Sequence, residues 1–176
     1  MYPFLKFISV LLKAGQKPAS HITDQGHIAM RAMPWDMDMF AELNNGRILT
    51  FYDLGRFDFA VTSGLMKVLK RKKWGLAVAG GTVRYRKRVT VFNKIDMVTQ
   101  FIGCDEKWFY IYQHMSVKGQ PTSSALFRTC VTGNRRAVPI AEVMQELGVT
   151  EADLPTLPDW AQSWIDADQD HPWPPQ

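Results

Sequence analysis

The spacing of apolar residues divides the chain into an early strand, a long helix and a run of later strands. Residues 27–34, "HIAMRAMP", predict a strand that Pro34 ends. A helix is expected from about Asn44 to Thr62, where apolar residues recur at helical spacing: Ile48, Leu49, Phe51, Tyr52, Gly55 and Phe59. Because so much of its circumference is apolar, this helix should be enclosed. Gly55 lowers helix propensity, which predicts that the helix backbone closely approaches a sheet there.

Strand candidates dominate the second half of the chain. After a basic turn at residues 66–73, four strands are predicted at 76–91, 95–104, 108–117 and 123–132. Asn93, Asp105 and Gly119 lie at the junctions, and such short connections predict an antiparallel meander. Residues 138–148, ending at Gly148, and 159–168 predict two short helices. This order is typical of an α+β fold in which an antiparallel sheet wraps around a central helix.

The N-terminal segment "MYPFLKFISVLLKAG" is apolar but contains Lys6 and Lys13. It is too short to span a bilayer. Two interpretations remain open: a short helix that packs on the body of the protein, or a weak, lysine-flanked contact with a membrane surface.

Charge is distributed unevenly along the chain. All 21 Lys and Arg residues lie at or before Arg136, together with nine acidic residues, whereas eight acidic residues follow it. A basic body favours a phosphate-bearing partner, such as a nucleotide-like cofactor, a nucleic acid or an anionic membrane, and the acidic tail can fold back on it. The chain contains only two cysteines, Cys104 and Cys130, so we expect a reducing, cytoplasmic environment. Neither these cysteines nor the four histidines have metal-ligand spacing, so we expect no metal site.

One short segment carries the candidate chemistry. Residues 35–56, "WDMDMFAELNNGRILTFYDLGR", place acids and amides directly ahead of the predicted helix. This pattern resembles the signature of hotdog-fold thioesterases of the 4-hydroxybenzoyl-CoA thioesterase and acyl-ACP thioesterase kind, through Asp36, Asp38, Asn44, Asn45, Gly46, Arg47, Asp53 and Arg56. The resemblance implies a hotdog domain at residues 21–136, between an N-terminal apolar segment (1–20) and an acidic C-terminal extension with short helices (137–176).

The resemblance also implies site residues. Asp38 matches the family's catalytic carboxylate, and the amide of Asn45 or Gly46 at the helix N-terminus is expected to polarise the thioester carbonyl. Unpaired N–H groups and the partial positive charge of a helix N-terminus suit a developing oxyanion. The carboxylate can act as nucleophile or as general base, and no cofactor is needed. The expected activity is therefore hydrolysis of acyl-CoA, or of acyl-ACP, to a carboxylic acid and a free thiol.

Simpler roles compete with chemistry at several of these positions. Asn44 is expected to be the helix N-cap, and Asp36 to order the loop, whereas capping explains Asp38 poorly. Asp53 and Arg56 have the spacing of an i,i+3 pair on the helix. Ala41-Glu42 replaces the Gly-His found in many members of the family. Glu42 is either a second carboxylate that raises the pKa of Asp38, with which it would share a desolvated site, or a solvated loop residue.

The basic stretch "TVRYRKRV", residues 82–89, suggests a binding surface. Strand alternation would place Arg84, Arg86 and Arg88 on one face, where they either contact the phosphates of coenzyme A or form a solvated face. Nucleic-acid binding is a competing hypothesis, but the aromatic residues of "KWFYIYQHM" fall on both strand faces, which packing explains better than a stacking platform. A non-catalytic acyl-CoA-binding protein is another alternative.

We expect a homodimer or a dimer of dimers (a homotetramer), because an open sheet edge requires cover.

Overall fold

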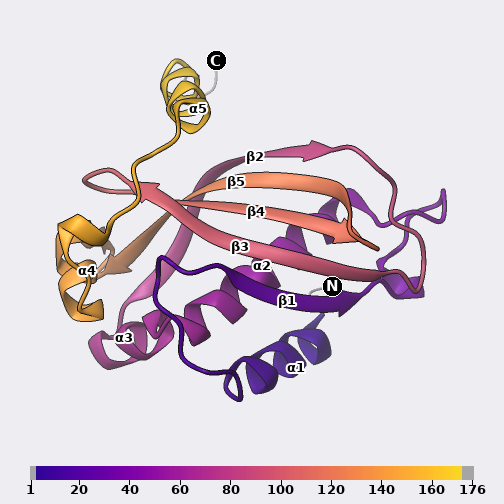
Figure 1. Cartoon of the computed structure of the whole chain (residues 1–176), viewed down its shortest axis with the longest axis horizontal. Helices are drawn as coiled ribbons and strands as arrows, with labels where there is room; N and C mark the ends of the chain where they lie inside the picture. Colours follow the sequence, from indigo (N-terminus) through magenta and orange to yellow (C-terminus); the bar gives the residue numbers. More distant parts are fainter. Residues whose placement is uncertain (1–2, 172–176) are drawn as a thin grey trace.

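The computed structural model describes residues 3–171. Within this range, one antiparallel sheet contains six strands, in the order β1-β3-β4-β5-β2 with β6 paired to β5. The strands are β1 (Gly26–Arg31), β2 (Gly75–Tyr85), β3 (Lys94–Cys104), β4 (Phe109–Val117), β5 (Gln120–Gly133) and β6 (Arg136–Ala137). The sheet is curved, and the first two strands in sequence, β1 and β2, lie at its opposite edges (Figure 1).

The helices lie on both sides of this sheet. They are α1 (Phe4–Ala14), α2 (Asn45–Thr62), α3 (Leu65–Lys72), α4 (Ile140–Leu147) and α5 (Asp159–Gln169), with short 3-10 helices at Pro34–Asp36 and Glu151–Asp153. Helix α2 crosses the concave face of the sheet, and α1 lies alongside it next to β1 (Figure 1). The sheet therefore wraps around a central helix, which confirms the predicted α+β hotdog fold.

Three sequence predictions about elements and their order were wrong. The predicted meander holds only for β3, β4 and β5, because β2 pairs with β5 instead of β3, and β3 pairs with β1. The strand expected at 76–91 ends at Tyr85, because the backbone N–H groups of Arg86 and Lys87 both donate to the Thr122 carbonyl and the chain leaves the sheet. Residues 66–73 were expected to form a turn but belong largely to α3. This helix starts after Gly64, which has the positive φ of 80°, and it buries a stripe made of Leu65, Val68 and Leu69.

Gly55 explains how closely α2 approaches the sheet. A Cβ atom built at this position would collide with the Met97 sulfur of β3, and it would lie 2.8 Å from the Gln113 amide nitrogen and 3.1 Å from the Thr99 hydroxyl. Gln113 is fully buried, and its amide nitrogen donates to the Tyr52 carbonyl of α2 and to Thr99. The predicted close approach is confirmed, and it joins the helix backbone directly to β3 and β4.

Gly55→Ala is expected to destabilise the protein. Overpacking costs about 1–3 kcal/mol, which exceeds the gain of at most about 1 kcal/mol in helix propensity. Urea unfolding measures the difference. In a Met97→Ala background, where the nearest of the three obstacles is absent, the same substitution should cost less; an equal cost in both backgrounds would show that the Met97 contact is not responsible.

The C-terminal extension packs against the basic body. Arg71 and Lys72 of α3 both form ion pairs with Glu146 of α4. Arg128 of β5 pairs with Asp168 of α5 at 2.8 Å. Helix α5 covers part of the outer face of the sheet, opposite α2, where the Trp160 ring meets Tyr112 edge-on at 5.2 Å between centroids. The acidic tail therefore folds back on the body, as its charge suggested.

The N-terminal segment forms a helix that packs on the body. Val10 and Ala14 are buried, and Phe7 meets Phe57 of α2 edge-on at 4.9 Å between ring centroids. Across residues 3–171, none of the helices has both the length and the apolarity required to cross a membrane. The buried Val10 and Ala14 side chains confirm that one face of α1 packs on the body of the protein.

Candidate functional site

The N-terminus of α2 is capped by Asn44, as predicted. The Asn44 side-chain oxygen accepts hydrogen bonds from the Gly46 N–H at 2.9 Å and the Arg47 N–H at 3.3 Å. Among residues 3–171, the Asn45 N–H has no hydrogen-bond partner. Of the two amides considered for the thioester carbonyl, that of Asn45 is therefore available, whereas that of Gly46 is already occupied by the cap.

Asp36 orders the segment that leads into the helix. Its side chain is fully buried, and its Oδ2 atom lies 2.6 Å from the Lys6 ammonium of α1 and accepts from the Met33 N–H. The Arg47 guanidinium lies 3.9 Å from the other oxygen, and the Asp36 carbonyl accepts from the Asn44 N–H. The expected loop-ordering role is confirmed, and α1 takes part in it.

Asp38 begins a tight loop that immediately precedes α2. Residues 37 and 43 pair as an antiparallel bridge, and the Asp38 N–H donates to the Glu42 carbonyl at 2.8 Å. The Asp38 Oδ1 atom accepts from the N–H groups of Phe40, at 2.9 Å, and Glu42, at 3.2 Å. Its Oδ2 atom forms no hydrogen bond or ion pair within residues 3–171. The carboxylate is thus held by one oxygen, half-buried, and presents the other.

Glu42 pairs with an arginine from a distant part of the chain. Its carboxylate forms an ion pair with the Arg88 guanidinium at 3.2 Å, and its backbone pairs with Thr90 as an isolated bridge. It is therefore not a free solvated residue. Its pairing with Arg88 also offsets the field that it would exert at Asp38. No long-range ion pair of this kind could be foreseen from local spacing.

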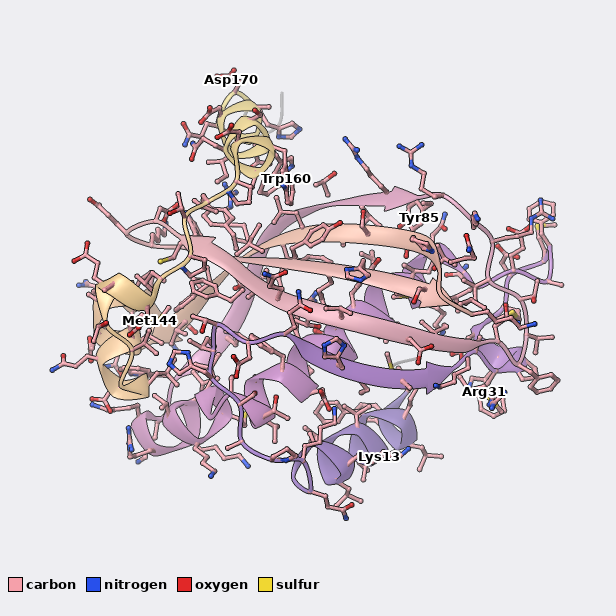
Figure 2. All side chains as sticks on the ribbon, viewed as in Figure 1. Lys13, Arg31, Tyr85, Met144, Trp160 and Asp170 are labelled. Atoms are coloured by element: carbon pink, nitrogen blue, oxygen red, sulfur yellow. The ribbon has the colours of Figure 1, made fainter. Side chains whose placement is uncertain are left out.

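The three arginines do not share one strand face. Only Arg84 lies in β2, whereas Arg86 and Arg88 follow the end of that strand, so the predicted alternation does not extend to them. All three are exposed. Arg84 lies beside a shallow pocket of about 260 Å³ on the outer face of the sheet, which it lines with Trp160 and Trp164 among others. Figure 2 shows Trp160 above the sheet, on the side of α5.

An apolar groove runs along α2 beside the edge strand β2. It has a volume of about 470 Å³ and is lined by Asp53, Arg56, Phe57, Met66, Leu69, Lys70, Lys73, Trp74, Leu76 and Val78. An interior cavity of about 30 Å³ adjoins it, sharing Arg56 and Leu76. The sequence did not reveal this groove, because one wall belongs to α3, which was expected to be a turn. The apolar spacing within residues 65–69 was the signal available.

Arg56 lies between the groove and the interior cavity. It forms the expected i,i+3 ion pair with Asp53 at 3.2 Å, and it donates to the Gln113 side-chain oxygen at 2.8 Å. Its guanidinium also lies 4.0 Å from the centre of the Phe127 ring. Within residues 3–171, Arg56 is the only cationic residue that lines both the groove and the interior cavity, and these contacts hold its side chain in place.

Other buried polar groups have structural partners. Burial raises the pKa of Tyr52, whose hydroxyl lies 2.8 Å from that of Ser123. Burial also raises the pKa of Asp58, although the Lys17 ammonium 2.7 Å away lowers it in part. Across residues 3–171, no group of three or more His, Cys, Asp or Glu residues is arranged to hold a metal ion.

The aromatic residues of β4 do not form an exposed stacking surface. Tyr110 is fully buried and Phe109 nearly so, while Trp108 and Tyr112 pack in the same cluster as helix α5. Base stacking requires exposed ring faces. The geometry therefore favours packing over nucleic-acid binding at this strand.

Comparisons with known proteins identify the family and agree with the fold. A sequence model of the thioesterase-like superfamily matches residues 33–165. Protein THEM6 of Xenopus laevis is 27% identical over 165 residues, which cover 92% of this chain and 78% of that protein.

Solved structures share the fold at low sequence identity. The probable thioesterase YbaW of Escherichia coli has a TM-score of 0.62 at 17% identity, over 69% of this chain and 95% of that one. The hypothetical protein SAV2348 of Staphylococcus aureus, solved in complex with CoA, has a TM-score of 0.65 at 12% identity, over 79% of this chain and 91% of that one. At these identities the likeness establishes a common fold.

Proposed function

We propose, because the chain belongs to the thioesterase-like superfamily, that it hydrolyses acyl-CoA thioesters to a carboxylic acid and free CoA. One observation carries the proposal: the Asp38 carboxylate, held through Oδ1 and with no partner at Oδ2 among residues 3–171, lies in the loop that leads directly to the Asn45 amide. Acyl transfer requires a positioned carboxylate and a donor for the developing oxyanion, and Asp38 and the Asn45 N–H can supply these two groups.

In the proposed reaction, the thioester carbonyl oxygen accepts a hydrogen bond from the Asn45 N–H. Charge that develops on this oxygen is stabilised by the amide and by the positive end of the α2 dipole. Asp38 Oδ2 either attacks the carbonyl carbon, giving an acyl-enzyme anhydride that water cleaves, or takes a proton from the attacking water. In both routes the C–S bond breaks and CoA leaves as a thiolate, which needs no strong acid.

The apolar groove beside α2 is suited to the acyl group. Asp53, at the groove, lies eight residues along α2 from Asn45, or about 12 Å at 1.5 Å per residue. The lining is mainly apolar, contributed by residues such as Met66, Leu69 and Val78. An acyl chain that starts at the Asn45 amide and follows α2 would reach this groove.

A second copy of the chain is expected at the β2 edge. Strand β2 pairs only with β5 within the described chain, and it exposes Leu76 by 37%, Val78 by 49% and Tyr85 by 45%. An uncovered, apolar edge strand is an association site. We propose a homodimer, or a dimer of dimers, in which β2 joins its counterpart and closes the groove that Leu76 and Val78 line.

Arg86 is the best candidate for a phosphate contact, because Arg88 is engaged by Glu42. Arg86→Ala is expected to raise KM for acyl-CoA about threefold to tenfold and to leave kcat much less affected, since such a contact binds ground and transition states alike. Added salt should have a similar effect. The control is Lys67→Ala on α3, at the other end of α2, and an equal rise in KM for both variants would show that general charge is responsible.

The activity is tested with a panel of acyl-CoA and acyl-ACP thioesters that differ in acyl length, by following thiol release. Hydrolysis that depends on acyl length supports the proposal. Tight binding of acyl-CoA without thiol release from any ester would instead identify a non-catalytic binding protein.

A further inference from the structure

Helix α1 presents an apolar face to solvent, in addition to the face that packs on the body. Leu5 is 87% exposed, Ile8 51% and Leu12 65%, whereas Val10 and Ala14 are buried. At 3.6 residues per turn, the three exposed residues fall within an arc of about 60°, separate from the buried side. Scattered exposed leucines are ordinary, but a continuous stripe on one helix marks an interaction surface.

A groove beside α1 extends this surface. It lies between α1 and β1, has a volume of about 500 Å³, and Leu5 and Trp35 both line it. Trp35 is 64% exposed, on the 3-10 helix that follows β1. The apolar stripe of α1 and an exposed tryptophan therefore share one side of the molecule. Tryptophan is enriched where proteins meet the polar boundary of a bilayer.

Among residues 3–171, the same groove is lined by four cations and by no acidic residue. Its charged residues are Lys6, Lys13, Arg31 and Lys94. Lys6 is neutralised by buried Asp36, and Lys94 pairs with Asp96 outside the groove. Arg31 donates to the Phe92 carbonyl and forms no ion pair within the part of the chain that the structure describes, so its positive charge is not compensated there. Figure 2 shows Lys13 on α1 and Arg31 at the end of β1, on the side of the sheet where α1 lies.

We propose that this face of α1, with Trp35 and the basic groove, docks the protein on an anionic lipid surface. The helix would lie in the plane of the interface, with Leu5, Ile8 and Leu12 among the acyl chains and Lys13 and Arg31 near lipid phosphates. At 11 residues α1 is about 16 Å long, too short to cross a hydrocarbon core of about 30 Å. A second copy of the chain is a poorer occupant, because a two-fold contact would bring the two basic grooves together.

The proposal is tested by sedimenting the full chain with vesicles of phosphatidylcholine alone and of phosphatidylcholine mixed with phosphatidylglycerol. The wild type should bind the mixed vesicles, and salt should weaken this binding. Leu5→Glu and Leu12→Glu should each lower the partition coefficient at least about tenfold, the effect of losing one buried leucine. Gln16→Glu is the matched control, since it adds the same charge just after α1, at an exposed position, without removing an apolar side chain.

Circular dichroism of each variant would establish that the fold is retained, as the exposure of Leu5 and Leu12 predicts. No wild-type binding to the mixed vesicles at low salt would overturn the proposal. Equal losses of vesicle binding in Leu5→Glu and Gln16→Glu would also overturn it. Self-association in the absence of vesicles that Leu5→Glu abolishes would show that a second copy of the chain, and not a lipid surface, binds this face of α1. None of these results depends on thioester hydrolysis.

Discussion

Asp38→Asn is expected to lower kcat for the preferred acyl-CoA at least about 100-fold, the scale of losing a positioned acid-base group. The substitution keeps the Oδ1 acceptor that holds the N–H groups of Phe40 and Glu42, so the loop should retain its shape. It replaces the unoccupied Oδ2 with an amide that can neither attack a carbonyl nor accept a proton from water. Steady-state thiol release measures the loss, and unfolding curves establish that the protein stays folded.

Glu42→Gln is the matched control for this prediction. It removes a carboxylate from the same loop, but one that is committed to the exposed Arg88 side chain, and such exposed pairs contribute about 0–1 kcal/mol. Its kcat should therefore stay much closer to that of the wild type. Near-normal hydrolysis in Asp38→Asn together with inactive Glu42→Gln would show that the catalytic carboxylate has been misassigned.

Lys6→Met is expected to lower the free energy of unfolding by about 3 kcal/mol. The Lys6 side chain is 16% exposed and its ammonium lies 2.6 Å from the fully buried Asp36 carboxylate, and removing one partner of a buried pair leaves an uncompensated charge. The Arg47 guanidinium, 3.9 Å from Asp36, compensates only in part, which places the loss near the lower end of the usual range. Urea unfolding at neutral pH measures it.

Lys13→Met separates this effect from a general consequence of removing charge from α1. Lys13 is exposed on the same helix, so its substitution should change the free energy of unfolding by no more than about 0.5 kcal/mol. Adding Asp36→Asn to Lys6→Met should recover part of the stability, because the buried charge is then absent. Similar losses for Lys6→Met and Lys13→Met would contradict the proposed role of the Lys6–Asp36 pair.

Local pattern was sufficient for most of the elements. The predicted helix from about Asn44 to Thr62 differs by one residue from α2, because its apolar periodicity and its capping residue lie close together in sequence. Gly148 ends α4 in the left-handed conformation, with φ at 71°, and a glycine at the end of a helix is likewise a local signal that the sequence shows directly. The resemblance of residues 35–56 to the thioesterase signature also pointed to the hotdog fold, and the role of Asp38 implied by it stays a prediction.

Interactions between distant residues were decided only by the tertiary structure. Asp36 meets Lys6, and Glu42 meets Arg88, across 30 and 46 positions of sequence, and neither pair has a local signature. The end of β2 at Tyr85 depends on the Thr122 carbonyl, which redirects two backbone N–H groups that the alternation of "TVRYRKRV" assigned to a strand. Amphipathic periodicity specifies which face of an element is buried, whereas its partner is set by the packing of the whole chain. For that reason the sequence by itself determined the central helix and its capping residue, and only the fold determined the contacts of the loop ahead of it, the groove beside α2 and the exposed stripe of α1.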